Sequence, residues 1–585
     1  MWRRRSITSG GAPPPWRPQL GGGRASQRRA AASSLPFFAH FVDDDDPTGR
    51  DEHQGASSLF SAAPSPSLTL LHRFSLQRIF PRAPAPPTTK ALSILDSTCS
   101  AFFSFAAAKL YLAVLDRPDP FTPALVEASL AHVLSAYPHW AGRLRLAKSS
   151  DQGRPYQTRF GRIWADWGSS SDPGVVLSFA KSDTPLAPLV PPLVEGEIVD
   201  GSALERAGVY PELSSVVALR PSPTEAPALA VQILHFTCGG VAVGFRVSHS
   251  LADAGTLNRF VADWADVHRA ALAAGGALDD VPLPDRPFEP EALDQHATGD
   301  LDADELDEAV EREYAKLPRT ALDLWADPVR HTDGIAVISG PDPSMDALEA
   351  ALGRPRGSPP PWSTWHPDQP VSVRSLFLSP PTLERIWAAA GGREGGVSPH
   401  DALVGHFWRL CVRARNLAAG TEVRITPAVG VRARLDPPLS PDMIGSNFVL
   451  LASISMSDKV AGAGGEAVAA QAIRATINSA TPSALSALLA HEAHTLDPLQ
   501  VQPYFCGEEH TSMSSWIGAG VYDADFGSGP PVYAEGVMPA VDGMLLFEDV
   551  PGEGRTWLER GARVKLALRD EVMKKVLADP ELLCL

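Results

Sequence analysis

A histidine and an aspartate four residues apart, His249 and Asp253, are the side chains of this chain best suited to chemistry. Residues 240–247 before them are small or apolar and predict a buried strand. The residues after them predict a helix, because apolar side chains recur at steps of three and four: Leu257, Phe260, Val261 and Trp264. An imidazole titrates near neutral pH and can accept a proton from an alcohol. His249, between a strand and a helix, is therefore a candidate general base.

Two other interpretations of the pair remain open at this stage. A histidine beside a strand is often a packed core residue or a surface residue. His249 and Asp253 could also share a metal ion. No further cluster of histidine, cysteine and acidic residues with ligand spacing accompanies them in the sequence, so we predict no metal site.

Charge and cysteine content exclude several classes of protein. The net charge of −17 disfavours nucleic acid, whose phosphates attract basic surfaces, and equally an anionic membrane surface. The most apolar run, 101–115, is shorter than the roughly 20 residues of a membrane span and contains Lys109, so no span is predicted. The five cysteines lack paired spacing, which favours a reducing, cytoplasmic compartment.

The length of 585 residues predicts two domains with additional segments. Residues 1–85 are rich in arginine, proline and glycine, which is typical of a disordered extension, a mis-assigned gene start or an organellar targeting segment. Residues 86–285 are predicted to form the first domain, 286–370 a proline-rich connector with an acidic helix at 302–317, and 371–585 the second domain.

Several stretches, in chain order, resemble the signatures of the BAHD-type acyl-CoA-dependent acyltransferases. In the first half these are Leu92–Asp96 (LSxLD), Tyr137–Leu144 (YPxAGRL with one extra residue), and Gly239-Gly240 followed by His249-x-x-x-Asp253. In the second half, residues 429–439 are similar to VDxRxRLxPPLP, with Gly430 in place of the aspartate. Asn447 matches the asparagine of a GN pair, although Ser446 stands where the glycine would be. Residues 514–530 resemble SSW…DFGWGxP, with Ser528 replacing the tryptophan, so the chain resembles a fungal-type or divergent member.

This resemblance implies an α/β fold of two similar chloramphenicol-acetyltransferase-like domains, with mixed β-sheets and a channel at their interface. It also implies the roles of individual residues. His249 would be the general base, and the carboxylate of Asp253 would turn away from it to pair with Arg432 or Arg434. Ser514 would donate to the oxyanion, and Trp516 would line the acceptor pocket. By the same resemblance Ser398 and Asn447 are substrate-binding candidates, and Asp525 and Gly527 are structural.

The implied reaction moves an acyl group from an acyl-CoA thioester to a hydroxyl or amine of a small molecule, typically a secondary metabolite. Acyl-CoA would be a co-substrate, with no permanently bound cofactor, and the protein would be a cytoplasmic monomer. Two alternatives remain: a peptide-bond-forming condensation domain, or an inactive binding protein of the same fold. A condensation domain usually has two adjacent histidines, whereas Ser248 precedes His249 here. An inactive binding protein would not need the intact His249 and Asp253 that this chain has.

Overall fold

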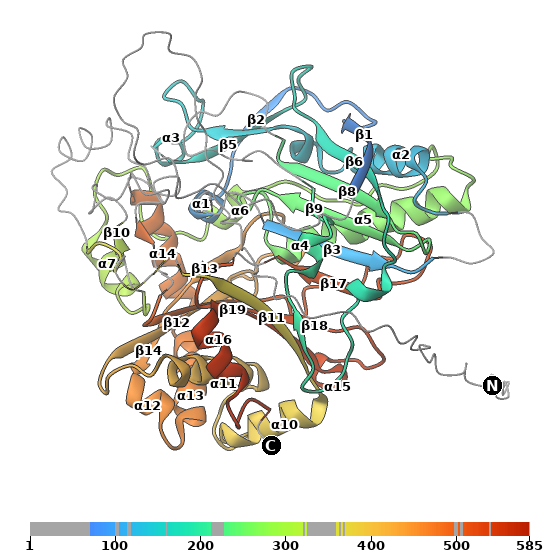
Figure 1. The fold of residues 1–585 in the computed structure, drawn as a ribbon. Helices are drawn as coiled ribbons and strands as arrows, with labels where there is room; N and C mark the ends of the chain where they lie inside the picture. Colours follow the sequence, from blue (N-terminus) through green and yellow to red (C-terminus); the bar gives the residue numbers. More distant parts are fainter. Residues whose placement is uncertain are drawn as a thin grey trace, which may run out of the picture. The chain divides into compact units, whose positions relative to one another are not determined.

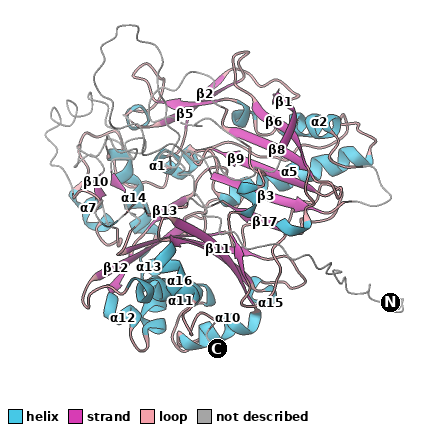
Figure 2. Ribbon diagram, in the orientation of Figure 1, coloured by secondary structure: helices cyan, strands magenta, loops and turns pink. Residues whose placement is uncertain are grey.

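The computed structural model describes residues 71–99, 105–113, 119–159, 161–211, 227–319, 322–323, 358–361, 364, 366, 369–495, 501–502, 507–537 and 540–583. Two large mixed sheets with helices packed on them organise these residues (Figure 1, Figure 2). We call each sheet with its helices a lobe. Most of residues 1–85 lie outside the described residues, so the interpretations offered for that segment stay predictions.

The first lobe contains a six-stranded sheet in which β6 and β8 are parallel and the other neighbours antiparallel. Its strand order is β1 (Leu71–Ile79), β6 (Val175–Ser182), β8 (Leu229–His235), β9 (Val241–Val247), β3 (Phe105–Tyr111) and β17 (Tyr533–Gly536). Two helices, α2 (Pro123–Val133) and α5 (Ala254–Ala273), pack together over one face of this sheet. The predicted succession of strand, histidine and helix is therefore present as β9, a turn and α5.

Smaller elements accompany the two large sheets. A three-stranded sheet joins β2 (Thr88–Ala91), β5 (Ile163–Trp167) and β4 (Arg143–Leu146), and a two-stranded one joins β10 (Leu322–Asp323) and β15 (Val501–Gln502). The short helices are α1 (Ile94–Thr98), α3 (Pro155–Thr158), α4 (Ala203–Arg206), α6 (Glu291–Asp294) and α7 (Glu308–Tyr314). The acidic helix is thus shorter than the predicted 302–317, because Asp307 caps its first turn by accepting the Ala309 N–H.

The second lobe contains the larger sheet, in which β12, β16 and β18 are parallel. Its order is β13 (Phe448–Leu450), β12 (Glu422–Gly430), β16 (His510–Ser515), β18 (Met544–Asp549), β19 (Ala562–Arg569), β11 (Val371–Leu378) and β7 (Ile198–Asp200), with β14 (Ser453–Met456) also on β12. The remaining helices are α10 (Pro380–Ala389), α11 (Pro399–Arg415), α12 (Ser457–Ala461), α13 (Gly465–Ser479), α14 (Pro482–His494), α15 (Trp557–Arg560) and α16 (Asp570–Leu577). No helix of the described ranges has both the length and the apolarity to span a bilayer.

The two halves of the chain exchange strands. β17 comes from the second half but pairs with β3 in the first sheet, whereas β7 comes from the first half and pairs with β11 in the second. In addition, β1 lies inside the segment 1–85 that the sequence placed before the first domain, and it pairs with β6 over its whole length. The first sheet therefore includes a strand that precedes residue 86, and alternation in this nine-residue strand is too weak a signal to separate it from the arginine-rich residues before it.

The lobes share one apolar core. The cluster formed by the first sheet and α5 also contains Val373, Trp516, Leu546 and Ala567 from one face of the second sheet. The opposite face of the second sheet packs on α10, α11, α13 and α16 in a separate cluster. Side chains that alternate along the strands of the second sheet therefore face either its own helices or the first lobe, and only the latter can reach His249.

Candidate active site at the lobe interface

His249 lies in the turn between β9, which ends at Val247, and α5, which begins at Ala254. Asp253 is the N-cap of α5: its Oδ1 accepts the Thr256 N–H at 2.7 Å. A cap of this kind satisfies an otherwise unpaired amide at the start of the helix. The four-residue spacing of the sequence motif therefore places His249 just before α5 and places Asp253 where its carboxylate accepts a hydrogen bond from an amide of the first turn.

The second carboxylate oxygen of Asp253 accepts a hydrogen bond from the second lobe. Arg432 Nη1 donates to Asp253 Oδ2 at 2.7 Å, and its Nη2 donates to Thr256 Oγ1 at 2.9 Å. Both side chains of the ion pair are largely buried, with 19% and 13% exposed. Arg434 instead donates to the Ile477 carbonyl at 3.4 Å. Of the two arginines that the sequence offered as partners, the structure thus pairs Arg432 with Asp253.

A turn of the second lobe, Gly445–Ser446–Asn447, is held between two carboxylates of the first lobe. Asp96 Oδ1 accepts the Ser446 N–H at 2.7 Å, and Asp253 Oδ2 accepts the Asn447 N–H at 3.2 Å. Gly445 has φ +124°, and a Cβ there would lie 2.9 Å from Asp96 Oδ1, so only glycine fits this close approach. This turn brings Ser446 and Asn447 to the histidine.

Aromatic rings enclose the imidazole of His249. The ring of Phe105 lies 4.8 Å from it, centroid to centroid, and that of Phe448 lies 5.4 Å away. Burial lowers the pKa of His249 below its ordinary value of 6.5, while its own backbone carbonyl and the charge of Asp253 act in the opposite direction. The imidazole is consequently neutral at pH 7 and able to accept a proton.

Trp516 belongs to the same aromatic group. Its ring is T-shaped to Phe105 at 5.9 Å, and it packs so closely on Gly536 that a Cβ there would lie 2.8 Å from Trp516 Cζ2. Ser514 precedes it by two residues on β16. Ser515 Oγ bonds to His400 Nε2 at 2.9 Å, on the side of the second-lobe helices. Since side chains alternate along a strand, Ser514 faces the first lobe, as Trp516 does.

The remaining residues singled out from the sequence have structural contacts. Ser398 caps α11, where its Oγ accepts the Asp401 N–H at 3.1 Å. Asp525 Oδ1 accepts the Gly527 N–H at 2.7 Å, and its backbone carbonyl accepts from Arg269 of α5 at 3.1 Å. The loop that contains Gly527 is thereby fastened to the back of α5. No contact joins Asp525 or Gly527 to His249 among the described residues.

Open space lies beside Phe448. β12 is an interior strand of the second sheet, yet Ala428 and Gly430 are exposed. Gly430 pairs directly with Phe448, and a Cβ added to it would have no atom within 4 Å. Because directly paired residues lie on the same face of a sheet, the room at Gly430 is on the face of the Phe448 ring.

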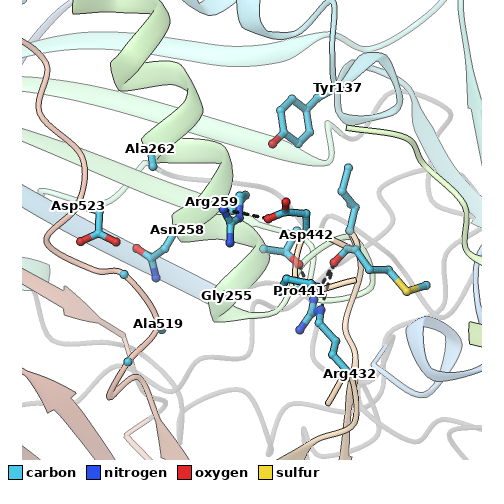
Figure 3. A pocket seen from close by; sticks show the side chains of 15 residues that line it. Tyr137, Gly255, Asn258, Arg259, Ala262, Arg432, Pro441, Asp442, Ala519 and Asp523 are labelled. Atoms are coloured by element: carbon cyan, nitrogen blue, oxygen red, sulfur yellow. Dashed lines mark hydrogen bonds and ion pairs between the residues drawn. The ribbon is translucent and has the colours of Figure 1, made fainter. Parts of the chain in front are cut away.

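A separate cavity of about 310 Å³ lies between the lobes, around the first turns of α5 (Figure 3). Its described lining comprises parts of α5, residues 441–444 and residues 518–520; it includes Arg432 but not His249. Arg259 of α5 forms an ion pair with Asp442 across it, at 2.9 Å. Sequence reasoning missed this cavity, because its lining comes from four segments that are distant in the sequence, one of them at Tyr137, and no motif marks Arg259 or Asp442.

The two mixed sheets and their helices form an α/β fold of the chloramphenicol-acetyltransferase-like type, which solved structures share. Vinorine synthase is similar to this chain with a TM-score of 0.52, at 19% identity, over 86% of this chain and 96% of that one. F. sporotrichioides TRI101, solved with coenzyme A and T-2, has a TM-score of 0.55 at 16% identity, over 84% and 98% of the two chains. These likenesses confirm the predicted fold class.

Sequence comparison identifies the family. A family model described as the Transferase family matches residues 196–312 and 385–583, more than half of the chain. The chain therefore belongs to this family, the BAHD-type acyl-CoA-dependent acyltransferases. Among its relatives are the acyltransferase AFT15-1 of Alternaria alternata, 24% identical over 78% of this chain and 86% of the relative, and putrescine hydroxycinnamoyltransferase 1 of Oryza sativa subsp. japonica, 26% identical over 74% and 81%. The described residues contain no group of side chains suited to a metal ion.

The ion pair between Asp253 and Arg432 should contribute strongly to stability. Asp253→Ala leaves the guanidinium of Arg432 buried without its carboxylate and removes the cap of α5, so it should destabilise the protein by roughly 3 kcal/mol and lower activity with it. Thermal denaturation and acyl transfer should be measured on the same preparations. Asp442→Asn is a matched control, because Asp442 pairs with Arg259 at 2.9 Å and with Arg286 at 3.5 Å but is far more exposed than Asp253, so its loss should cost at most about 1 kcal/mol. A variant that melts like the wild type but is as inactive as one lacking His249 would instead make Asp253 catalytic.

Proposed function

We propose that His249 is the general base of an acyl transfer from an acyl-CoA thioester to a hydroxyl or amine. The observation that carries this proposal is a partly buried imidazole, its pKa lowered by loss of solvation, on a turn that the Asp253–Arg432 pair fixes between the lobes. A thioester is already activated. The enzyme must therefore add a base, a donor to the developing oxyanion and alignment of the two substrates.

The proposed reaction has two stages. His249 takes the proton of the acceptor as its oxygen or nitrogen attacks the thioester carbonyl, which forms a tetrahedral oxyanion. The hydroxyl of Ser514, on the face of the second sheet toward the first lobe, donates to that oxyanion. The intermediate then collapses, the carbon–sulfur bond breaks and the imidazolium returns its proton to the thiolate, so the products are an ester or amide and free coenzyme A.

In this proposal Asp253 braces the site and is not a proton relay. Its two oxygens are occupied by the Thr256 amide, the Asn447 amide and Arg432. None of these contacts leads to the imidazole. The carboxylate acts at a distance, through the position of the turn and through its charge.

Asn447 is the proposed polar contact to substrate. It is almost fully buried, and neither its amide nitrogen nor its amide oxygen has a hydrogen-bond partner in the described part of the chain. A buried amide without partners is costly, and a bound ligand would relieve that cost. Trp516 and Phe105 supply an apolar wall, and the open space at Gly430 gives room for the bound group.

The acceptor is proposed to be a small alcohol or amine of secondary metabolism. Fungal acyltransferases are among the relatives, as is a plant enzyme named for putrescine, which supports an amine among the possible acceptors. Acyl-CoA is the co-substrate, and Ser398 stays a proposed contact to it. The cytoplasmic location and the monomeric state also stay predictions.

Removal of the base is the direct test of this function. His249→Ala should keep its melting temperature within a few degrees of the wild type and lower kcat by roughly 10²–10⁴-fold, which is the usual contribution of a general base. Free thiol release should be measured over a panel of acyl-CoA donors with alcohol and amine acceptors. His235→Ala is a control, since His235 lies at the end of β8 and contacts Asp119. A folded His249→Ala variant with near wild-type turnover would end this assignment.

The kinetic order gives a second test, because transfer should be direct, without an acyl-enzyme. β9 ends at Val247, so Ser248 and Ser250 lie in the turn and strand alternation cannot decide their direction. Ser446 touches the imidazole, but its hydroxyl donates to the His249 carbonyl and is not deprotonated by the ring. With both substrates varied, double-reciprocal plots should intersect. Parallel lines, or an acyl adduct detected by mass spectrometry after incubation with donor alone, would contradict direct transfer.

A further inference from the structure

Ser446 contacts the proposed base on the side of Nδ1. This residue is fully buried, and its Oγ lies 3.2 Å from His249 Nδ1. The family pattern has a glycine at this position, which could make no such contact. The hydroxyl of Ser446 is thus a departure of this chain from the family pattern.

The contact with Ser446, together with the bond of the imidazole to its own backbone carbonyl, determines which nitrogen of His249 carries the proton. A hydroxyl has one hydrogen to donate and two lone pairs that accept. The hydrogen of Ser446 is donated to the backbone carbonyl of His249. Ser446 Oγ can therefore only accept from Nδ1, so Nδ1 must carry a hydrogen. In a neutral imidazole protonated at Nδ1, the basic lone pair is on Nε2.

Ser446 is itself fixed from the first lobe. Its N–H donates to Asp96 Oδ1 at 2.7 Å, and the other oxygen of Asp96 accepts from the N–H and the hydroxyl of Ser93. Burial raises the pKa of Asp96 to about 6, which still leaves it charged at neutral pH. The Cys99 thiol also hydrogen-bonds with Ser446 and, because burial raises its pKa, stays protonated. Ser446 is therefore fixed at its backbone N–H by Asp96 and at its hydroxyl by the His249 carbonyl and the Cys99 thiol.

We propose that Ser446 is a positioning residue that holds His249 as the Nδ1–H tautomer and so presents Nε2 as the base. This proposal deepens the proposed function and rests on it. In the part of the chain that the structure describes, the charged or titratable groups on this side of the imidazole include Asp253 with its partner Arg432 and, beyond Ser446, Asp96 and Cys99. Ser446 differs from all of them because it contacts the ring directly and carries no charge.

The effect on the pH profile follows from the direction of the hydrogen bond. The imidazolium donates from Nδ1 more strongly than the neutral ring does, so the Ser446 oxygen stabilises the protonated form. Removing that oxygen should lower the pKa of His249 further, and the acid limb of kcat/KM should move to lower pH. At the plateau, kcat should fall because part of the imidazole adopts the other tautomer, with the proton on Nε2.

The test uses Ser446→Ala and Ser446→Gly, the second being the residue of the family pattern. Both should lower the plateau kcat about tenfold, with the acid limb displaced to lower pH and KM for acyl-CoA little changed. Ser453→Ala is the matched control: it removes another buried hydroxyl of the second lobe, bonded to Thr476 at 2.9 Å, and should leave kcat and the pH profile unchanged. Wild-type kinetics in both Ser446 variants would overturn the proposal. So would a fall in kcat that follows the melting temperature while the acid limb stays in place.

A second measurement does not depend on activity. In protein labelled with nitrogen-15 histidine, the ring signals of His249, identified by their loss in His249→Gln, should show a hydrogen on Nδ1 at neutral pH. In Ser446→Ala the signals should shift toward the other tautomer. A hydrogen on Nε2 in the wild type would overturn the proposal even if transfer depends on His249. Transfer that does not depend on His249 would contradict the proposed function instead.

Discussion

The ion pair between Asp253 and Arg432 is the interaction on which the rest of the site depends. A single carboxylate caps α5, binds the guanidinium from the other lobe and accepts an amide of the Gly445–Asn447 turn. Asp96 holds the same turn from its other side. Because a buried charge without a partner is costly, the two lobes are bound to one relative position. The histidine, on the turn just before the cap, is placed by that constraint.

Placement and burial together set the chemistry. A histidine enclosed by Phe105 and Phe448 loses solvation of its charged form, and this loss outweighs the attraction of Asp253 and the bond to its own carbonyl. The pairing of Asp253 with Arg432 further limits that attraction, since the guanidinium offsets the carboxylate. The brace thus fixes the turn without making the imidazole cationic, and a base of this kind can serve a substrate whose leaving group is a thiolate.

The sequence predicted those features whose residues lie close together along the chain, and did not predict those whose residues lie far apart. The strand, turn and helix around His249 were predicted because apolar periodicity is local, and the cap of α11 at Ser398 because capping chemistry spans only three residues. The choice between Arg432 and Arg434 was left open, because both lie on the same short segment and only the path of the chain decides which reaches Asp253. The exchange of β7 and β17 between the lobes, the strand β1 and the contact of Ser446 with His249 were not predicted. Each joins segments about a hundred or more residues apart, which no local pattern records.

A crystal structure with coenzyme A and an acceptor bound together would show whether the reaction takes place at His249, between the lobes. The sulfur of coenzyme A and the acceptor oxygen or nitrogen should lie on opposite sides of the imidazole, with the acceptor atom within hydrogen-bond distance of Nε2. The Trp516 ring should lie against one of the bound groups. Reacting atoms bound in the cavity between Arg259 and Asp442, away from the imidazole, would contradict a reaction at His249.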